Sequence, residues 1–195
     1  MNIPNSLTII RILLIPVFIL VFYLPYKWTH AAAAILFALG AITDWLDGYL
    51  ARKLNQTSRF GAFLDPVADK LLVAVALVLL VQADPRAWLA ITAAIIIGRE
   101  IAVSALREFM AEMGQRSQVK VAMVGKIKTM AQMSAIVLMI YRVPVGEFPT
   151  YAVGFALLII AAGLTLWSMF VYLRAAWPSL RPGVEDDEPE APGAS

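Results

Sequence analysis

Six long apolar stretches, separated by short polar connections, constrain the fold of this chain more than any other feature. A helix needs about 20 mostly apolar residues to cross a bilayer. The chain is 61% hydrophobic and 15% charged, whereas soluble domains average about a quarter charged residues. We therefore predict an all-α, integral membrane bundle of six transmembrane helices, occupying one domain over residues 1–178. The expected spans are residues 7–25, 31–53, 61–82, 87–109, 121–142 and 149–174.

The basic residues are distributed unequally between the two sets of connections, and this asymmetry predicts orientation because cytoplasmic loops are enriched in Lys and Arg. The connections after the second and fourth stretches are rich in Lys and Arg, whereas the opposite side carries only Lys27, Arg86 and Arg142. Both termini should then face the cytoplasm. A basic membrane body suits anionic lipids and phosphorylated substrates rather than nucleic acid as partners.

The C-terminal segment and the missing cysteines set two further limits. Residues 179–195 contain an acidic run from Glu185 to Glu190 with Pro and Gly and little apolar bulk, so we expect a disordered tail. The chain has no cysteine, which excludes disulfides, thiolate metal ligands and a cysteine nucleophile.

Four aspartates gather where the second stretch ends and the third begins. Asp44, Asp47, Gly48 and Ala51 follow i, i+3, i+4, i+7 spacing and share one helical face. Gly61, Asp65 and Asp69 share a face of the next helix in the same way. Helices joined by a short connection pack antiparallel, so the four carboxylates can converge on one cytoplasmic cavity.

The energetic cost of these acids favours a metal site. One Asp in a helix centre costs about 2.5–3.5 kcal/mol on insertion scales, and four close together also repel one another. Hard cations such as Mg²⁺ or Mn²⁺ prefer carboxylate oxygen and relieve both problems. Two such ions would suit phosphoryl chemistry, because they can clamp the attacking and leaving oxygens. The alternative is that the acids only pair with Arg52, Arg59 or Lys70.

Small and basic residues beside the acids suit a nucleotide diphosphate. Gly48, Ala51 and Gly61 permit close approach of a helix or a flat ligand, and Arg52 could bind a diphosphate with two hydrogen bonds. For Gly48 or Gly61 taken alone, helix packing explains the glycine as well as substrate contact does.

The string Asp44-x2-Asp47-Gly48-x2-Ala51-Arg52-x8-Gly61-x3-Asp65-x3-Asp69 resembles the complete signature of the CDP-alcohol phosphotransferase family. The resemblance implies a six-helix membrane fold, a homodimer and a two-metal site open to the cytoplasm. It implies that Asp44, Asp47, Asp65 and Asp69 bind metal and that Asp69 is also the general base. Gly48, Ala51, Arg52 and Gly61 would hold the cytidine diphosphate. Spacing alone does not choose the base among the four acids.

Further stretches are similar to the bacterial phosphatidylglycerophosphate synthase branch of that family. The resemblance covers approximately residues 2–175 and includes residues 2–8 with Arg11, residues 60–70, residues 98–108 and residues 125–133. It implies transfer of a phosphatidyl group from CDP-diacylglycerol to glycerol 3-phosphate, in the inner membrane of a bacterium.

Four basic residues are candidates for the acceptor phosphate. Arg99 and Arg107 lie on the cytoplasmic half of the fourth span, and Lys126 and Lys128 begin the fifth. A common depth with the aspartates favours phosphate binding. Glu100 lies on the same helical stripe as Arg107, however, so a salt bridge that only packs helices is the alternative.

Polar residues at the entry to the first span are candidates for the nucleotide end. The family places Asn5, Thr8 and Arg11 beside the CDP-diacylglycerol diphosphate. Helix capping and snorkelling are the alternatives for these side chains.

Two rival functions stay open. The same chemistry could use another acceptor, namely inositol phosphate, serine or phosphatidylglycerol. The acid cluster could instead be the permeation site of a divalent-cation transporter. All acids of the cluster lie at one end of the spans, however, whereas transport needs access from both faces.

Overall fold

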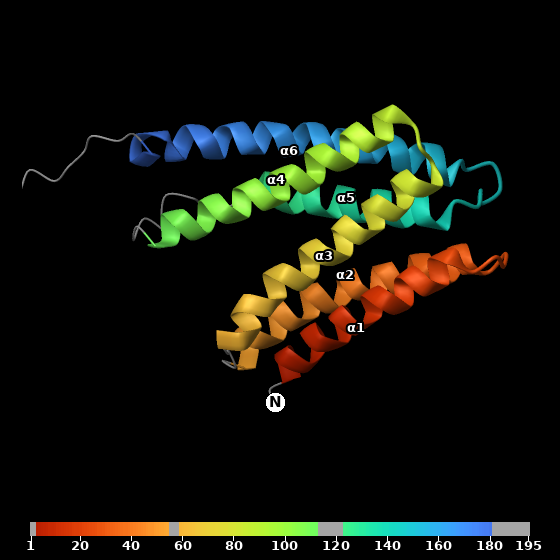
Figure 1. Cartoon of the computed structure of the whole chain (residues 1–195), viewed down its shortest axis with the longest axis horizontal. Helices are drawn as coiled ribbons and strands as arrows, with labels where there is room; N and C mark the ends of the chain where they lie inside the picture. Colours follow the sequence, from red (N-terminus) through yellow and green to blue (C-terminus); the bar gives the residue numbers. More distant parts are fainter. Residues whose placement is uncertain (1–2, 55–58, 113–122, 181–195) are drawn as a thin grey trace, which may run out of the picture.

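A computed structural model describes residues 3–54, 59–112 and 123–180. These residues form six α-helices and no named strand (Figure 1). The helices are α1 (Ile3–Tyr23), α2 (Thr29–Leu54), α3 (Arg59–Ala83), α4 (Ala87–Glu112), α5 (Met123–Tyr141) and α6 (Thr150–Leu180). The all-α prediction is confirmed, and each predicted span coincides with one helix to within a few residues. α6 extends to Leu180, two residues beyond the predicted end of the helical domain. The predicted tail lies almost entirely outside the described residues.

Successive helices run in opposite directions. The α1–α2, α3–α4 and α5–α6 connections lie together at one end of the bundle, on the right of Figure 1. The start of α1 and the end of α6 lie toward the opposite end. We call the first end the loop end and the second the signature end, because the signature residues of α2 and α3 lie there. The most extensive helix contacts are those of α5 with α6 and of α1 with α2.

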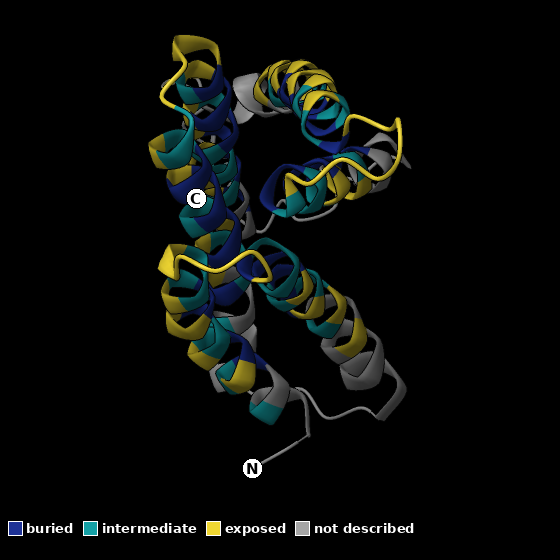
Figure 2. Cartoon of the chain, turned by 90° about the vertical axis from the view of Figure 1, so that its right-hand side faces the viewer, coloured by how far each residue is buried: buried dark blue, intermediate teal, exposed yellow. Residues whose placement is uncertain are grey.

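The core is apolar, and so is much of the surface. Phe18, Phe37 and Leu77 are fully buried. Other large apolar side chains, such as Leu20, Trp88 and Trp167, are 67–73% exposed. Figure 2 shows the buried faces turned toward neighbouring helices and the exposed faces turned outward. Helices that are apolar on every face are typical of apolar surroundings rather than of water.

Two helices contain segments that are long and apolar enough to cross a membrane by length and composition. These segments are Ala87–Met110 of α4 and Thr150–Val171 of α6, within the part of the chain that was described. α1 and α2 contain shorter apolar segments, Thr8–Tyr23 and Thr29–Thr43. The α2 segment ends at Thr43, which is followed by the part of α2 whose side chains are mostly outside the described residues. The number of spans therefore stays a prediction.

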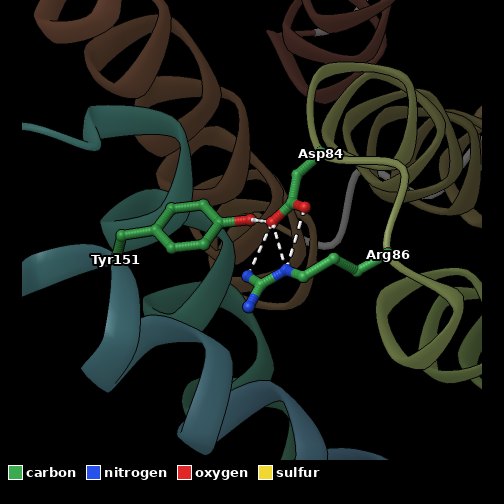
Figure 3. A network of polar contacts seen from close by, with 3 residues as sticks. All are labelled: Asp84, Arg86 and Tyr151. Atoms are coloured by element: carbon green, nitrogen blue, oxygen red, sulfur yellow. Dashed lines mark hydrogen bonds and ion pairs between the residues drawn. The ribbon is translucent and has the colours of Figure 1, made fainter.

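A polar network closes the loop end (Figure 3). Arg86 donates to both carboxylate oxygens of Asp84, with Nε–Oδ1 at 2.9 Å and Nη2–Oδ2 at 2.6 Å. The Tyr151 hydroxyl also donates to Asp84, and the Arg86 guanidinium lies 4.9 Å from the centre of the Phe155 ring. The network joins the α3–α4 connection to α6, far from the signature residues. The hydrogen bond from Arg86 is the main cause that lowers the pKa of Asp84, against an opposing effect of burial.

Candidate functional site

The structure describes the side chains of five predicted site residues: Thr8, Arg11, Asp69, Arg99 and Lys128. The other candidates lie on helices, but their side chains are outside the described part of the chain. Those candidates are Asn5 on α1; Asp44, Asp47, Gly48, Ala51 and Arg52 on α2; Gly61 and Asp65 on α3; Arg107 on α4; and Lys126 on α5. Among the described side chains, no group of three or more His, Cys, Asp or Glu residues could hold a metal. Because only Asp69 of the four acids belongs to that set, the metal cluster stays a prediction.

Asp69 lines a small polar cavity at the signature end. The cavity has a volume of about 60 Å³ and lies between α3, α4 and α5. Asp69 and Lys70 come from α3, Glu100 comes from α4, and Lys128 and Gln132 come from α5. Lys128 and Gln132 are four residues apart and therefore share a helical face. A carboxylate and a buried lysine from distant parts of the sequence thus meet at one cavity.

Glu100 connects the two described cations of the predicted acceptor site. Its Oε2 accepts a hydrogen bond from Arg99 Nη1 at 2.9 Å and lies 3.6 Å from Lys128 Nζ. Arg99 and Lys128 are 8% and 5% exposed at the side chain, whereas Glu100 is 31% exposed. Buried cations need such a partner, because removing a charge from water without compensation is costly.

Arg99 extends toward α6 and is not among the residues that line the cavity. Its Nη2 donates to Ser168 Oγ at 2.9 Å, and Ser168 Oγ donates to the Thr165 carbonyl at 2.9 Å. Sequence reasoning gave a salt bridge with Glu100 as the alternative for Arg107, whose side chain lies outside the described residues. In the structure it is Arg99 that forms a salt bridge with Glu100. Lys128, by contrast, both pairs with Glu100 and lines the cavity.

Thr8 and Arg11 are fully buried on α1. Snorkelling would carry the Arg11 guanidinium to water, so that alternative is wrong for Arg11. Helix capping is also wrong for Thr8 and Arg11, whereas the side chain of Asn5 lies outside the described residues. α1 begins at Ile3, which places Asn5 in its first turn and Thr8 and Arg11 deeper in the helix, beyond the N-cap position.

An apolar groove adjoins the polar cavity. It has a volume of about 290 Å³ and lies between α3 and α4, with walls that include Leu71, Ile97 and Ile101. Lys70, Val73 and Glu100 line both the groove and the polar cavity. The site therefore combines charged groups with a neighbouring apolar surface.

Sequence reasoning missed two contributors to this site. Gln132 is 5% exposed and lines the cavity, and Ser168 anchors Arg99 from α6. Gln132 could have been found from its position one turn after Lys128, on the helical face that the two residues share. Ser168 has no such local signal, because its partner lies 69 residues away in the sequence.

The described helices expose apolar side chains on their outer faces and gather charged groups beside an apolar groove at one end. The chain belongs to the CDP-alcohol phosphatidyltransferase family, whose model matches residues 1–167.

Curated relatives extend this finding over most of the chain. A Pseudomonas fluorescens protein is 60% identical over 182 residues, which cover 93% of each chain. An Escherichia coli K12 protein is 55% identical over 175 residues, covering 90% of this chain and 94% of its own. A Yersinia pestis protein is 54% identical over 180 residues, covering 92% and 97%. All three are named CDP-diacylglycerol–glycerol-3-phosphate 3-phosphatidyltransferase.

Proposed function

We propose that this chain transfers the phosphatidyl group of CDP-diacylglycerol to glycerol 3-phosphate, giving phosphatidylglycerophosphate and CMP in phospholipid biosynthesis. Relatives of 54–60% identity that carry this activity in their names support the proposal. Within the structure, one observation carries it: a candidate base, Asp69, and a candidate phosphate ligand, Lys128, line the same cavity. Family membership also favours a transferase over the rival reading as a cation transporter.

Asp69 is the proposed general base. It would accept the proton of the C1 hydroxyl of glycerol 3-phosphate, and the resulting alkoxide would attack the β-phosphorus that bears diacylglycerol. The bond from that phosphorus to the CMP oxygen would break, and CMP would leave. General-base catalysis typically contributes about 10²–10⁴-fold in rate, so the proposal assigns Asp69 a large effect.

Asp44, Asp47, Asp65 and Asp69 are the proposed ligands of two divalent cations, Mg²⁺ or Mn²⁺, which would neutralise charge on the diphosphate. The donor set fits hard cations because it consists of carboxylates on two helices, α2 and α3, that contact each other and share a short connection. The chain contains no cysteine and a single histidine.

The remaining candidates divide between the two substrates. Gly48, Ala51, Arg52 and Gly61, with Asn5, Thr8 and Arg11, would bind the CDP end of the lipid. Arg107, Lys126 and Lys128 would bind the phosphate of glycerol 3-phosphate. Arg99 would support them through Glu100, since the structure directs it toward α6.

The proposed setting is the bacterial inner membrane. The helical domain, residues 1–178, would span it six times as a homodimer, with both termini and the active site on the cytoplasmic side. The outward apolar faces of the helices support this setting. The acidic tail, residues 179–195, would lie in the cytoplasm.

An acceptor panel tests the reaction and the base together. Purified protein with CDP-diacylglycerol and Mg²⁺ or Mn²⁺ should release CMP with glycerol 3-phosphate, but not with inositol phosphate, serine or phosphatidylglycerol. Asp69→Asn should lower the rate by about 10²-fold or more. Glu147→Gln, a change in the exposed α5–α6 connection, is the control and should retain full activity. Release with another alcohol alone would contradict the acceptor assignment.

Arg107→Ala tests the acceptor pocket separately. Because the guanidinium is assigned to the acceptor phosphate, its loss should raise the KM for glycerol 3-phosphate far more than the KM for CDP-diacylglycerol. Steady-state kinetics with each substrate varied in turn would measure both values. Equal changes in the two values would remove Arg107 from the acceptor site.

A further inference from the structure

One carboxylate, that of Glu100, serves two buried cations through the same oxygen atom. Its Oε2 lies 2.9 Å from Arg99 Nη1 and 3.6 Å from Lys128 Nζ. Lys128 lines the Asp69 cavity, and Arg99 does not. The carboxylate therefore links a cation at the cavity wall to a cation behind it.

The flexibility of lysine explains why such a link matters. A lysine ammonium is a compact charge on a flexible four-carbon stem, and ordering that stem costs rotamer entropy. Binding energy is lost when a mobile ligand group must be ordered at the moment of binding. A partner that already holds Nζ at the cavity wall removes part of that cost. Glu100 is in position to act as this partner.

Glu100 is itself fixed from α6. Arg99 Nη1 binds Glu100, Arg99 Nη2 binds Ser168, and Ser168 binds the backbone carbonyl of Thr165. This chain of hydrogen bonds joins α4 to the middle of a long helix. The position of the Lys128 ammonium thus depends on residues from α4 and α6 as well as on its own helix.

We propose that Glu100 is a positioning residue that orients Lys128 toward the acceptor phosphate, with Arg99 and Ser168 holding the carboxylate in place. The inference rests on the proposed function, because it assumes a phosphorylated acceptor in the Asp69 cavity. Glu100 acts only through Lys128 and does not contact the reacting atoms. Its carboxylate is repelled by the acceptor phosphate, so its benefit must come from orientation.

A double-mutant cycle tests this dependence. Glu100→Gln should raise the KM for glycerol 3-phosphate roughly tenfold, with the KM for CDP-diacylglycerol changed by less than about twofold. In a Lys128→Met background, the same change should add less than about twofold, because the group that it orients is gone. Glu147→Gln, in the exposed α5–α6 connection, is the matched control for loss of a carboxylate and should change neither value.

Glu100→Asp separates orientation from charge balance, and it covers the case in which Glu100→Gln fails to fold. The shorter side chain keeps the charge but withdraws the carboxylate from Lys128. If Glu100 orients Lys128, this variant should have a higher KM for glycerol 3-phosphate. If Glu100 only balances the charge of Lys128, the KM should not change. The proposal is overturned by an unchanged or lower KM in either Glu100 variant, or by additive effects in the Lys128→Met background. Absence of CMP release by the wild-type protein with glycerol 3-phosphate would instead refute the proposed function.

Discussion

At the residue scale, Asp84 has an ionisation state that is coupled to folding. The hydrogen bond from Arg86 is the largest influence on its carboxylate and lowers its pKa below the ordinary value of 3.8, while burial acts in the opposite direction. A group whose pKa is lower in the folded state stabilises the fold above the unfolded pKa. That stabilisation is lost as the pH falls through the folded pKa.

Asp84→Asn should therefore lower the midpoint of thermal unfolding in detergent at pH 7, because it removes the ionised acceptor of Arg86 and Tyr151. The difference between variant and wild type should shrink as the pH falls below about 3.8, where the Asp84 carboxyl of the unfolded chain takes up a proton, and should be lost as the pH falls through the lower pKa of the folded state. A difference that is the same at pH 7 and at pH 3 would show that charge plays no part. Unfolding scans at several pH values provide the measurement.

At the element scale, the packing of α5 against α6 depends on a glycine. A Cβ atom at Gly154 would lie 2.9 Å from the Ala135 carbonyl oxygen and 2.9 Å from Met139 Cγ. The backbone oxygen cannot move aside without shifting α5, which carries Lys128 and Gln132 into the cavity. The close approach of these two helices thus bears on the candidate site as well as on stability.

Gly154→Ala should destabilise the protein by about 1–3 kcal/mol, the usual cost of overpacking, despite the better helix propensity of alanine. Gly163→Ala is the matched control on the same helix, because a Cβ atom there meets nothing within 4 Å. It should be neutral or stabilise by up to about 1 kcal/mol. Thermal unfolding of both variants checks the pair, and equal midpoints would contradict the packing argument.

At the scale of the whole molecule, the bundle places its two kinds of connection at opposite ends (Figure 1). The loop end holds the α5–α6 connection with Glu147, and the signature end holds the start of α1 and the end of α6. If the bundle spans the inner membrane as proposed, these ends face different compartments.

The absence of cysteine from the chain makes this arrangement testable by labelling. Glu147→Cys should react with a membrane-impermeant maleimide in intact spheroplasts, because the loop end faces outward. Ser195→Cys should react only after lysis, since the tail is expected in the cytoplasm. Labelling of both positions in intact spheroplasts would contradict the even number of spans.

The number, order and approximate limits of the helices were predictable from the sequence, because they depend on local features. Apolar length sets each helix, and breakers such as Pro25, Pro85 and Pro144 separate the helices at the loop end. The spacing of Asp44, Asp47, Asp65 and Asp69 likewise assigned each acid to a helical face. The convergence of the four acids stays a prediction, since three of their side chains lie outside the described part.

Only the tertiary structure decided which distant residues meet. It brought Lys128 of α5 and Asp69 of α3 to the walls of one cavity, directed Arg99 toward Ser168 of α6, and buried Arg11 completely. Helical periodicity gives the face on which a side chain lies, but not the helix that this face contacts. That choice depends on how all six helices pack together, so the role of Glu100 as a shared partner emerged from the fold alone.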